Sequence, residues 1–111
     1  MSTVSLLVLL AGCGSFPSPV DQLAASQAAV RAAEEAGADR DPEAQLYLKL
    51  AKENLDKGKS RMDAEDNEIA DRALRKAEAD GELARGIARS RTAQGNAEEA
   101  KKALGKLKPI N

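Results

Sequence analysis

Residues 41–55, with the sequence DPEAQLYLKLAKENL, form the most apolar segment downstream of residue 13. Asp41 followed by Pro42 is typical of a helix start, because aspartate caps free N–H groups and proline fits the first helical position. The apolar residues then recur three and four apart, which predicts one buried face: Ala44, Tyr47, Leu48, Ala51 and Leu55, widened by Leu46 and Leu50. We expect this helix at the centre of the fold, ending near Lys57 and Gly58, where glycine can adopt the left-handed conformation.

A second helix is predicted before this segment, over residues 20–36. Ser18, Pro19 and Asp21 are typical of its start, with a capping serine, a proline at the first helical position and an acid three residues after the cap. Gly37 marks its end. The expected inner stripe comprises Val20, Leu23, Ala24, Gln27 and Val30, with Ala28 and Ala33 beside it.

A long third helix is predicted from Met62 or Asp63, since no proline follows until Pro109. This helix contains two glycines, Gly81 and Gly86. They indicate either that the backbone of a neighbouring helix approaches closely, which we favour, or that the helix is locally less stable there. Its expected face comprises Ile69, Ala73, Ala77, Ala84, Ile87 and Ala88, flanked by Leu74 and Leu83.

Residues 94–96, with the sequence QGN, are the best place for a break in this third helix, followed by a short last helix over residues 97–107. Acid-to-base pairs four residues apart support exposed helices: Glu68 with Arg72, Asp71 with Arg75, and Glu98 with Lys102. The predicted fold is therefore all-α, a small antiparallel bundle of two shorter helices and one long helix, with a short C-terminal helix as an optional addition.

The composition predicts a thin core. After Cys13 the chain has only fourteen Leu, Ile and Val residues and two aromatic ones, Phe16 and Tyr47, whereas alanine is abundant. Little apolar area then offsets the chain entropy, so we expect a marginally stable domain that gains from self-association. Disorder is the alternative, but a net charge of only -1 together with many alanines favours helix.

The N-terminus carries a different signal. The apolar run over residues 6–10 leads into Ala11, Gly12 and Cys13, and Cys13 is the only cysteine of the 111 residues. Leu10-Ala11-Gly12-Cys13 resembles the lipobox of bacterial lipoproteins, although the segment before it lacks the usual Lys or Arg. The alternative is that these residues form the end of a short buried helix. A transmembrane helix is not an option, because the apolar run is too short to span a bilayer. We therefore expect a signal peptide over residues 1–12, a lipidated linker over 13–19 and a helical domain over 20–108.

This resemblance implies that Cys13 is acylated and becomes the first residue of the mature chain. Two or more acyl chains hold a protein stably on a bilayer, at ~0.8 kcal/mol per buried methylene. Gly14 stands where an aspartate commonly signals inner-membrane retention in enteric bacteria, so the analogy implies the outer membrane, on its periplasmic face. The expected location is the cell envelope, with the membrane as a partner through the N-terminal lipid.

A second resemblance rests on the motifs that follow. These are Ala36-Gly37-Ala38, Leu48-x-x-Ala51-x-x-x-Leu55 and Ala70-x-x-Ala73-x-x-x-Ala77-x-x-Asp80-x-x-Leu83-Ala84. Together with the lipobox and the proline-containing linker, they resemble a group of bacterial envelope lipoproteins catalogued as domain of unknown function 4398, over residue 13 to about residue 90. The resemblance implies an envelope location but no activity, because none is assigned to that family.

Catalysis is not expected. The chain has no histidine, its one cysteine is taken by the lipid, and the serines have no suitable base beside them. Four acidic residues near position 65 suggest a cation site, but their spacing does not match a calcium-binding loop, and acids at a helix start stabilise its positive end: Asp63, Glu65, Asp66 and Glu68. We therefore expect no metal and no other cofactor.

The charges are distributed unevenly. Residues 13–84 contain ten basic and sixteen acidic residues, net -6, whereas residues 85–111 contain seven basic and two acidic ones, net +5. Bases at the end of a long helix complement its dipole. The alternative hypothesis is contact with an anionic lipid or envelope polymer, through Arg85, Arg89, Arg91, Lys101, Lys102, Lys106 and Lys108.

The last helix is also predicted to have an apolar edge opposite its lysines, made by Ala97, Ala100, Leu104 and Leu107. Nucleic acid is not an expected partner, because aromatic side chains for base stacking are absent from this region. Two classes of function remain. One is a structural or protein-interaction module that docks an envelope protein or itself, and the other is a binding module for an anionic polymer or lipid surface.

Overall fold

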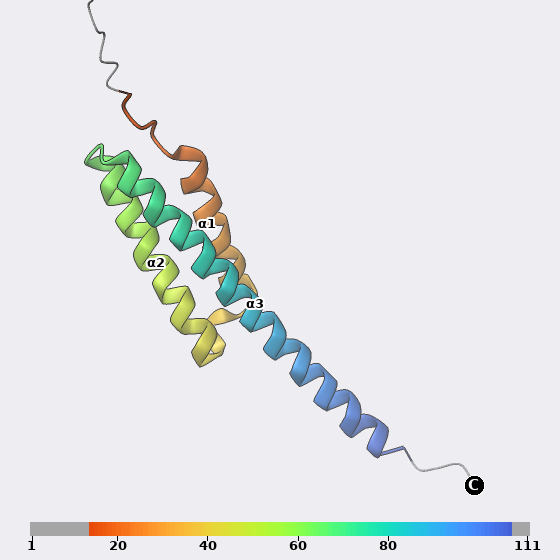
Figure 1. Ribbon diagram of the computed structural model, residues 1–111. Helices are drawn as coiled ribbons and strands as arrows, with labels where there is room; N and C mark the ends of the chain where they lie inside the picture. Colours follow the sequence, from red (N-terminus) through yellow and green to blue (C-terminus); the bar gives the residue numbers. More distant parts are fainter. Residues whose placement is uncertain (1–13, 108–111) are drawn as a thin grey trace, which may run out of the picture.

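The computed structural model describes residues 14–107 as three helices and one short 3-10 helix. Helix α1 spans Val20–Glu35, η1 spans Ala38–Arg40, α2 spans Pro42–Asp63 and α3 spans Asn67–Gly105. This part of the chain contains no strand, so the predicted all-α bundle is confirmed. Figure 1 shows the three helices side by side, with α3 running on well beyond the other two.

The start of α2 and the end of α1 follow the predicted local signals. The Asp41 carboxylate accepts hydrogen bonds from the backbone N–H groups of Glu43 and Ala44, at 3.0 and 2.9 Å, and Pro42 is the first residue of the helix. Gly37 has a φ of 83°, a value that few side chains tolerate, and it directs the chain from α1 into η1. These signals act within a few residues, which is why the sequence reveals them.

The predicted capping box at the start of α1 is wrong. Pro19 occupies the capping position, and no side chain caps the helix. Ser18 lies one residue too early and contributes only its backbone carbonyl, which accepts a hydrogen bond from the Val20 N–H at 2.9 Å.

The predicted end of α2 at Lys57 and Gly58 is also wrong, since the helix continues to Asp63. Gly58 is buried against α3, and a Cβ atom built on it would lie 2.4 Å from the Leu74 Cδ2 atom. The glycine therefore serves the close approach of two helices. The chain turns instead at Ala64–Asp66, where Glu65 has a φ of 62°, and this places the start of α3 later than the predicted Met62 or Asp63.

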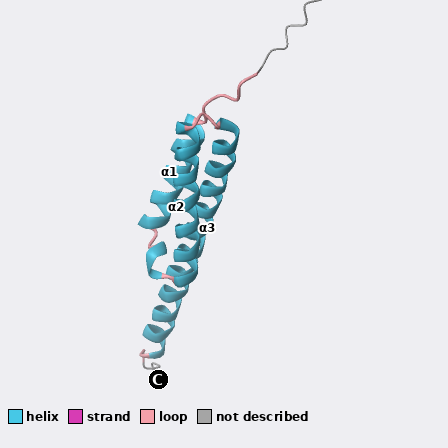
Figure 2. Cartoon of the chain, turned by 90° about the vertical axis from the view of Figure 1, so that its left-hand side faces the viewer, coloured by secondary structure: helices cyan, strands magenta, loops and turns pink. Residues whose placement is uncertain are grey.

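The central helix is α3, which corrects the prediction that the second helix lies at the centre. Helix α3 packs along both α1 and α2, while α1 and α2 contact each other much less (Figures 1 and 2). At Gly81 a Cβ atom would lie 3.0 Å from the Ala29 backbone carbon, so α1 approaches closely there, as favoured from the sequence. The same expectation is wrong for Gly86, where a Cβ atom would meet nothing within 4 Å. The core is built mostly of alanine, as the composition predicted: Val30, Ala33, Ala38, Ala44, Leu48, Ala51, Leu55, Leu74, Ala77, Ala84 and Ala88.

The predicted face of α2 is confirmed except at Leu46, and the predicted faces of α1 and α3 are confirmed only in part. Residues Ala44, Leu48, Ala51 and Leu55 are buried, with Tyr47 packed beside them. Three predicted groups are exposed instead: Val20, Ala24 and Ala28 in α1, Leu46 in α2, and Ile69 and Leu83 in α3. The buried residues of α1 are Ser26, Ala29, Val30 and Ala33, a face turned from the predicted stripe. Alanine-rich helices have little contrast between faces, so their periodicity orients them poorly.

The predicted break at residues 94–96 is absent. Helix α3 passes through Gly95 without interruption, and the expected separate last helix is its continuation. A glycine costs a helix ~1 kcal/mol, which the neighbouring turns of a helix this long can absorb.

Candidate functional site

The last part of α3 lies outside the bundle. Among residues 14–107, Ala88 is the last buried one, and residues 89–107 are all exposed. Figure 1 shows this part of the helix as the blue segment beyond the ends of α1 and α2. At 1.5 Å per residue, α3 is about 58 Å long. The projecting part therefore offers helix surface that the rest of the described chain leaves uncovered.

The segment before α1 leaves the molecule at the opposite end. The Phe16 carbonyl accepts a hydrogen bond from the Asn67 side chain at 3.1 Å, and Pro19 is buried, so this segment lies against the first turn of α3. The predicted lipobox of Leu10, Ala11, Gly12 and Cys13 precedes the described residues. Within residues 14–107, no helix combines the length and apolar character needed to cross a membrane.

Arg85 and Arg89 lie where α3 leaves the bundle. They line an open surface hollow of about 630 Å³ together with Ala32, Glu35 and Ala36 at the end of α1. Arg85 is half-buried and Arg89 is exposed. These two members of the predicted basic set therefore face the end of α1, where helix dipole and carboxylate are both negative.

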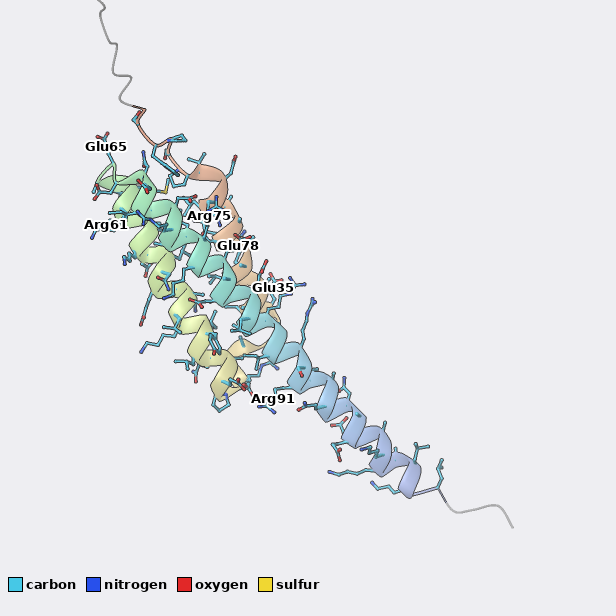
Figure 3. All side chains as sticks on the ribbon, viewed as in Figure 1. Glu35, Arg61, Glu65, Arg75, Glu78 and Arg91 are labelled. Atoms are coloured by element: carbon cyan, nitrogen blue, oxygen red, sulfur yellow. The ribbon has the colours of Figure 1, made fainter. Side chains whose placement is uncertain are left out.

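Arg91 is held by the start of α2. Its Nε donates a hydrogen bond to the Asp41 Oδ2 at 3.1 Å, and its Nη2 lies 3.5 Å from the Glu43 Oε2. Figure 3 shows Arg91 beside the first turn of α2, at the end of the bundle opposite Arg61 and Glu65. Its partners lie about 50 positions away in the sequence, so no local pattern indicates this contact. Arg91 therefore contributes to a fixed contact between α2 and α3.

The lysines of the predicted set lie further out. Lys101, Lys102 and Lys106 are exposed, and the Lys101 Nζ lies 3.6 Å from Glu98, which replaces the predicted pairing of Glu98 with Lys102. Lys108 is outside the described residues. At 100° per residue, Lys102 and Lys106 lie roughly opposite the predicted apolar edge, whose members are all exposed: Ala97, Ala100, Leu104 and Leu107.

The structure therefore does not bring the predicted basic residues together. Arg85 and Arg89 lie at the end of α1, Arg91 is paired with α2, and the lysines lie some 15 Å further along the helix. Residues 93–107 contain three lysines and two glutamates, a net charge of only +1. The positive field of the tip is accordingly weaker than the sequence count suggests.

Two of the four acidic residues near position 65 engage arginines. Asp66 lies 3.1 Å from Arg61, and Glu68 lies 3.1 Å from Arg72, as the spacing predicted. Among residues 14–107, no three acidic, histidine or cysteine side chains converge as metal ligands would. These carboxylates therefore act in the turn between α2 and α3.

Asp71 and Arg75 form the second predicted pair of α3, at 2.8 Å. The hydrogen bond and the charge of Asp71 raise the pKa of Arg75 above its usual value. The carboxylate of Asp71 therefore favours the cationic form of Arg75.

Fold and surface together define a class of protein: an elongated, alanine-cored three-helix bundle whose central helix projects beyond it. The model of one protein family, described as a domain of unknown function (DUF4398), matches residues 21–100, and the chain belongs to this family. The match begins at α1 and includes most of the projecting part of α3. No curated protein and no solved structure matches the chain.

Proposed function

We propose that this protein is a cell-envelope lipoprotein, anchored through acylated Cys13, that acts as a structural or protein-interaction module. The observation that carries the interaction role is the projecting part of α3, which exposes apolar side chains on a helix that the bundle holds at its base. Leu104 is 67% exposed, and Leu107, two residues after the end of α3, is 70% exposed. Exposed apolar side chains in a row are typical of surfaces that bind another molecule.

The positions of the two ends of the molecule support an anchor at one end and a docking surface at the other. The segment that leads from Cys13 lies against the start of α3, and the free tip of the same helix lies at the far end (Figure 1). A straight helix of about 58 Å separates an anchored end from a docking end. An anchor at Cys13 therefore leaves the tip of α3 clear for a partner.

The anchor is tested by replacing its sulfur. We expect Cys13→Ser to abolish labelling with radioactive palmitate and to move the protein from the membrane fraction to the soluble fraction, because the acyl chains supply nearly all of the membrane affinity. The control is Cys13→Ser combined with Ser15→Cys, which restores a thiol two residues away from the lipobox and should remain unlabelled. Membrane retention of the Cys13→Ser protein would contradict the proposal.

A second candidate function is binding to an anionic envelope polymer or lipid surface, favoured by the exposure of Lys101, Lys102 and Lys106 at the tip. We expect the triple substitution of these lysines by glutamine to weaken binding to isolated cell walls or to anionic vesicles several-fold at low salt, with a smaller difference at high salt. The control is Lys49→Gln, Lys57→Gln and Lys59→Gln, three exposed lysines of α2. Equal binding by the two triple variants would contradict this candidate.

A further inference from the structure

We propose that two copies of this chain pair through the outward face of α3, with the two helices running in opposite directions. The inference deepens the interaction role proposed above, on which it rests, by naming the partner as a second copy. It starts from a repeat on the solvent side of α3 that packing within one chain does not use.

Small or apolar residues recur along this side at alternating steps of four and three, the spacing of a two-stranded coiled coil. The repeat begins with Ala79 and Leu83 and ends with Ala100 and Leu104. All of its members are exposed, with Leu83 at 46% and Leu104 at 67%. We call the repeat the outer seam, and its four inner members are Gly86, Ser90, Ala93 and Ala97.

The outer seam lies nearly opposite the face that packs in the bundle. At 100° per residue, its members point away from Ala77, Ala84 and Ala88, which are buried against the other helices. A Cβ atom built on Gly86 meets nothing within 4 Å. The folding of one chain therefore does not explain the repeat, and it leaves the face accessible to another helix over its whole length.

The sizes of the side chains fit an antiparallel pair. When Ser90 of one copy faces Ala93 of the other, every further member of the outer seam also meets another member. Leu83 then faces Ala100, Ala79 faces Leu104, and Gly86 faces Ala97. Each leucine fills the space beside an alanine, so the distance between the helices stays even, as close packing requires. A parallel pair in register would instead place leucine against leucine and glycine against glycine.

The charges beside the outer seam fit the same arrangement. Asp80 and Lys101 follow equivalent positions of the repeat, and the antiparallel pairing brings Asp80 of each copy next to Lys101 of the other. Flanking charges of this kind set the orientation of coiled coils. Asp80 is half-buried and accepts a hydrogen bond from Asn54 of α2 at 3.3 Å, so it lies between α2 and the outer seam.

The bundle permits this pairing. Helices α1 and α2 lie on the opposite side of α3, so each copy keeps its bundle clear of the other (Figures 1 and 2). The arrangement has twofold symmetry, the commonest for a pair of identical chains. The two Asn67 residues lie at opposite ends, about 74 Å apart at 1.5 Å per residue. A dimer on one bilayer therefore lies with its long axis along the surface.

The test is the mass of the full chain carrying Cys13→Ser, measured by sedimentation equilibrium in a mild detergent over a range of concentrations. We expect a monomer–dimer equilibrium, and we expect Ala93→Glu to raise the dissociation constant at least about 100-fold, because symmetry places two unpaired charges near the axis. The control is Ala28→Glu, at an exposed alanine of α1. A monomer at every concentration, or a dimer unaffected by Ala93→Glu, would overturn the proposal.

Direction and register are tested separately. We expect Asp80→Lys and Lys101→Asp each to raise the dissociation constant about tenfold, and the double variant to restore it. In the Cys13→Ser background, a mixture of Gly86→Cys and Ala97→Cys chains should form a mixed disulfide, and Ala97→Cys alone should form none. Crosslinking of Ala97→Cys with itself would overturn the antiparallel register. None of these measurements depends on the lipid, so failure here and failure of the Cys13 anchor remain distinguishable.

Discussion

Gly58→Val is expected to lower the free energy of unfolding by about 3 kcal/mol, because the new side chain overlaps a neighbour that has no room to move. A Cβ atom at this position would lie 2.4 Å from Leu74 Cδ2 and 2.6 Å from Leu74 Cγ. Leu74 is fully buried, so its side chain cannot turn out to solvent. Either α2 and α3 separate or Leu74 leaves its preferred rotamer, and both cost packing energy. Urea denaturation followed by circular dichroism measures the loss.

The matched control is Gly95→Val, the same substitution at a helical glycine of α3 that lies outside the outer seam and has nothing within 4 Å of the new Cβ. We expect it to change stability by less than about 0.5 kcal/mol, since valine and glycine differ only modestly in helix propensity. A double-mutant cycle gives a sharper test. Leu74→Ala alone should cost about 3 kcal/mol through the cavity that it leaves. In combination with Gly58→Val it should cost clearly less than the sum, because the valine fills that cavity. Simple additivity would contradict the packing described here.

Asp41→Ala is expected to lower the free energy of unfolding by about 2 kcal/mol, because one carboxylate performs two tasks. One oxygen caps α2 through two backbone N–H groups, and the other accepts a hydrogen bond from Arg91 of α3 at 3.1 Å. The loss of the cap accounts for about 1 kcal/mol of the total. The rest comes from the contact with Arg91, whose side chain is 54% exposed, which limits that contribution to about 1 kcal/mol.

Two further variants separate these contributions. Asparagine caps helices as well as aspartate does, so Asp41→Asn should retain the cap and lose only about 1 kcal/mol, from the weakened contact with Arg91. Asp39→Ala should change stability by less than about 0.5 kcal/mol, because the Asp39 side chain is 67% exposed and lies 4.0 Å from Arg40. Thermal denaturation of the three proteins side by side should give the order Asp41→Ala, Asp41→Asn, Asp39→Ala from largest to smallest loss. Equal losses from the two Asp41 variants would show that the cap contributes little.

The candidate site could be predicted only in part. The helical state of the last segment and its apolar edge opposite the lysines follow from the spacing of Ala97, Ala100 and Leu104. The continuity of this segment with α3 and its projection beyond the bundle were not predicted, because a break was expected at residues 94–96. The sequence did not reveal that Arg91 pairs with Asp41 and Glu43, because the pairing joins residues about 50 positions apart. The seven basic residues were treated as one surface because they follow one another in the sequence. On a helix, however, successive residues are turned by about 100°, so these side chains point in different directions.

What the sequence by itself determined is the helical content, the start of α2 at Asp41 and Pro42, the turn at Gly37 and the buried face of α2. Each depends on forces that act within a few residues: capping, a glycine at positive φ, and leucines spaced three and four apart. Only the tertiary structure decided that Gly58 and Gly81 lie at helix contacts, that Gly95 does not end α3, and that α3 is the central helix. The physical reason is the alanine core. Alanine stabilises a helix but gives its faces little contrast in hydrophobicity. The buried face is therefore chosen by how closely two helix backbones can approach. That distance depends on two segments far apart in the sequence, so neither segment alone predicts it.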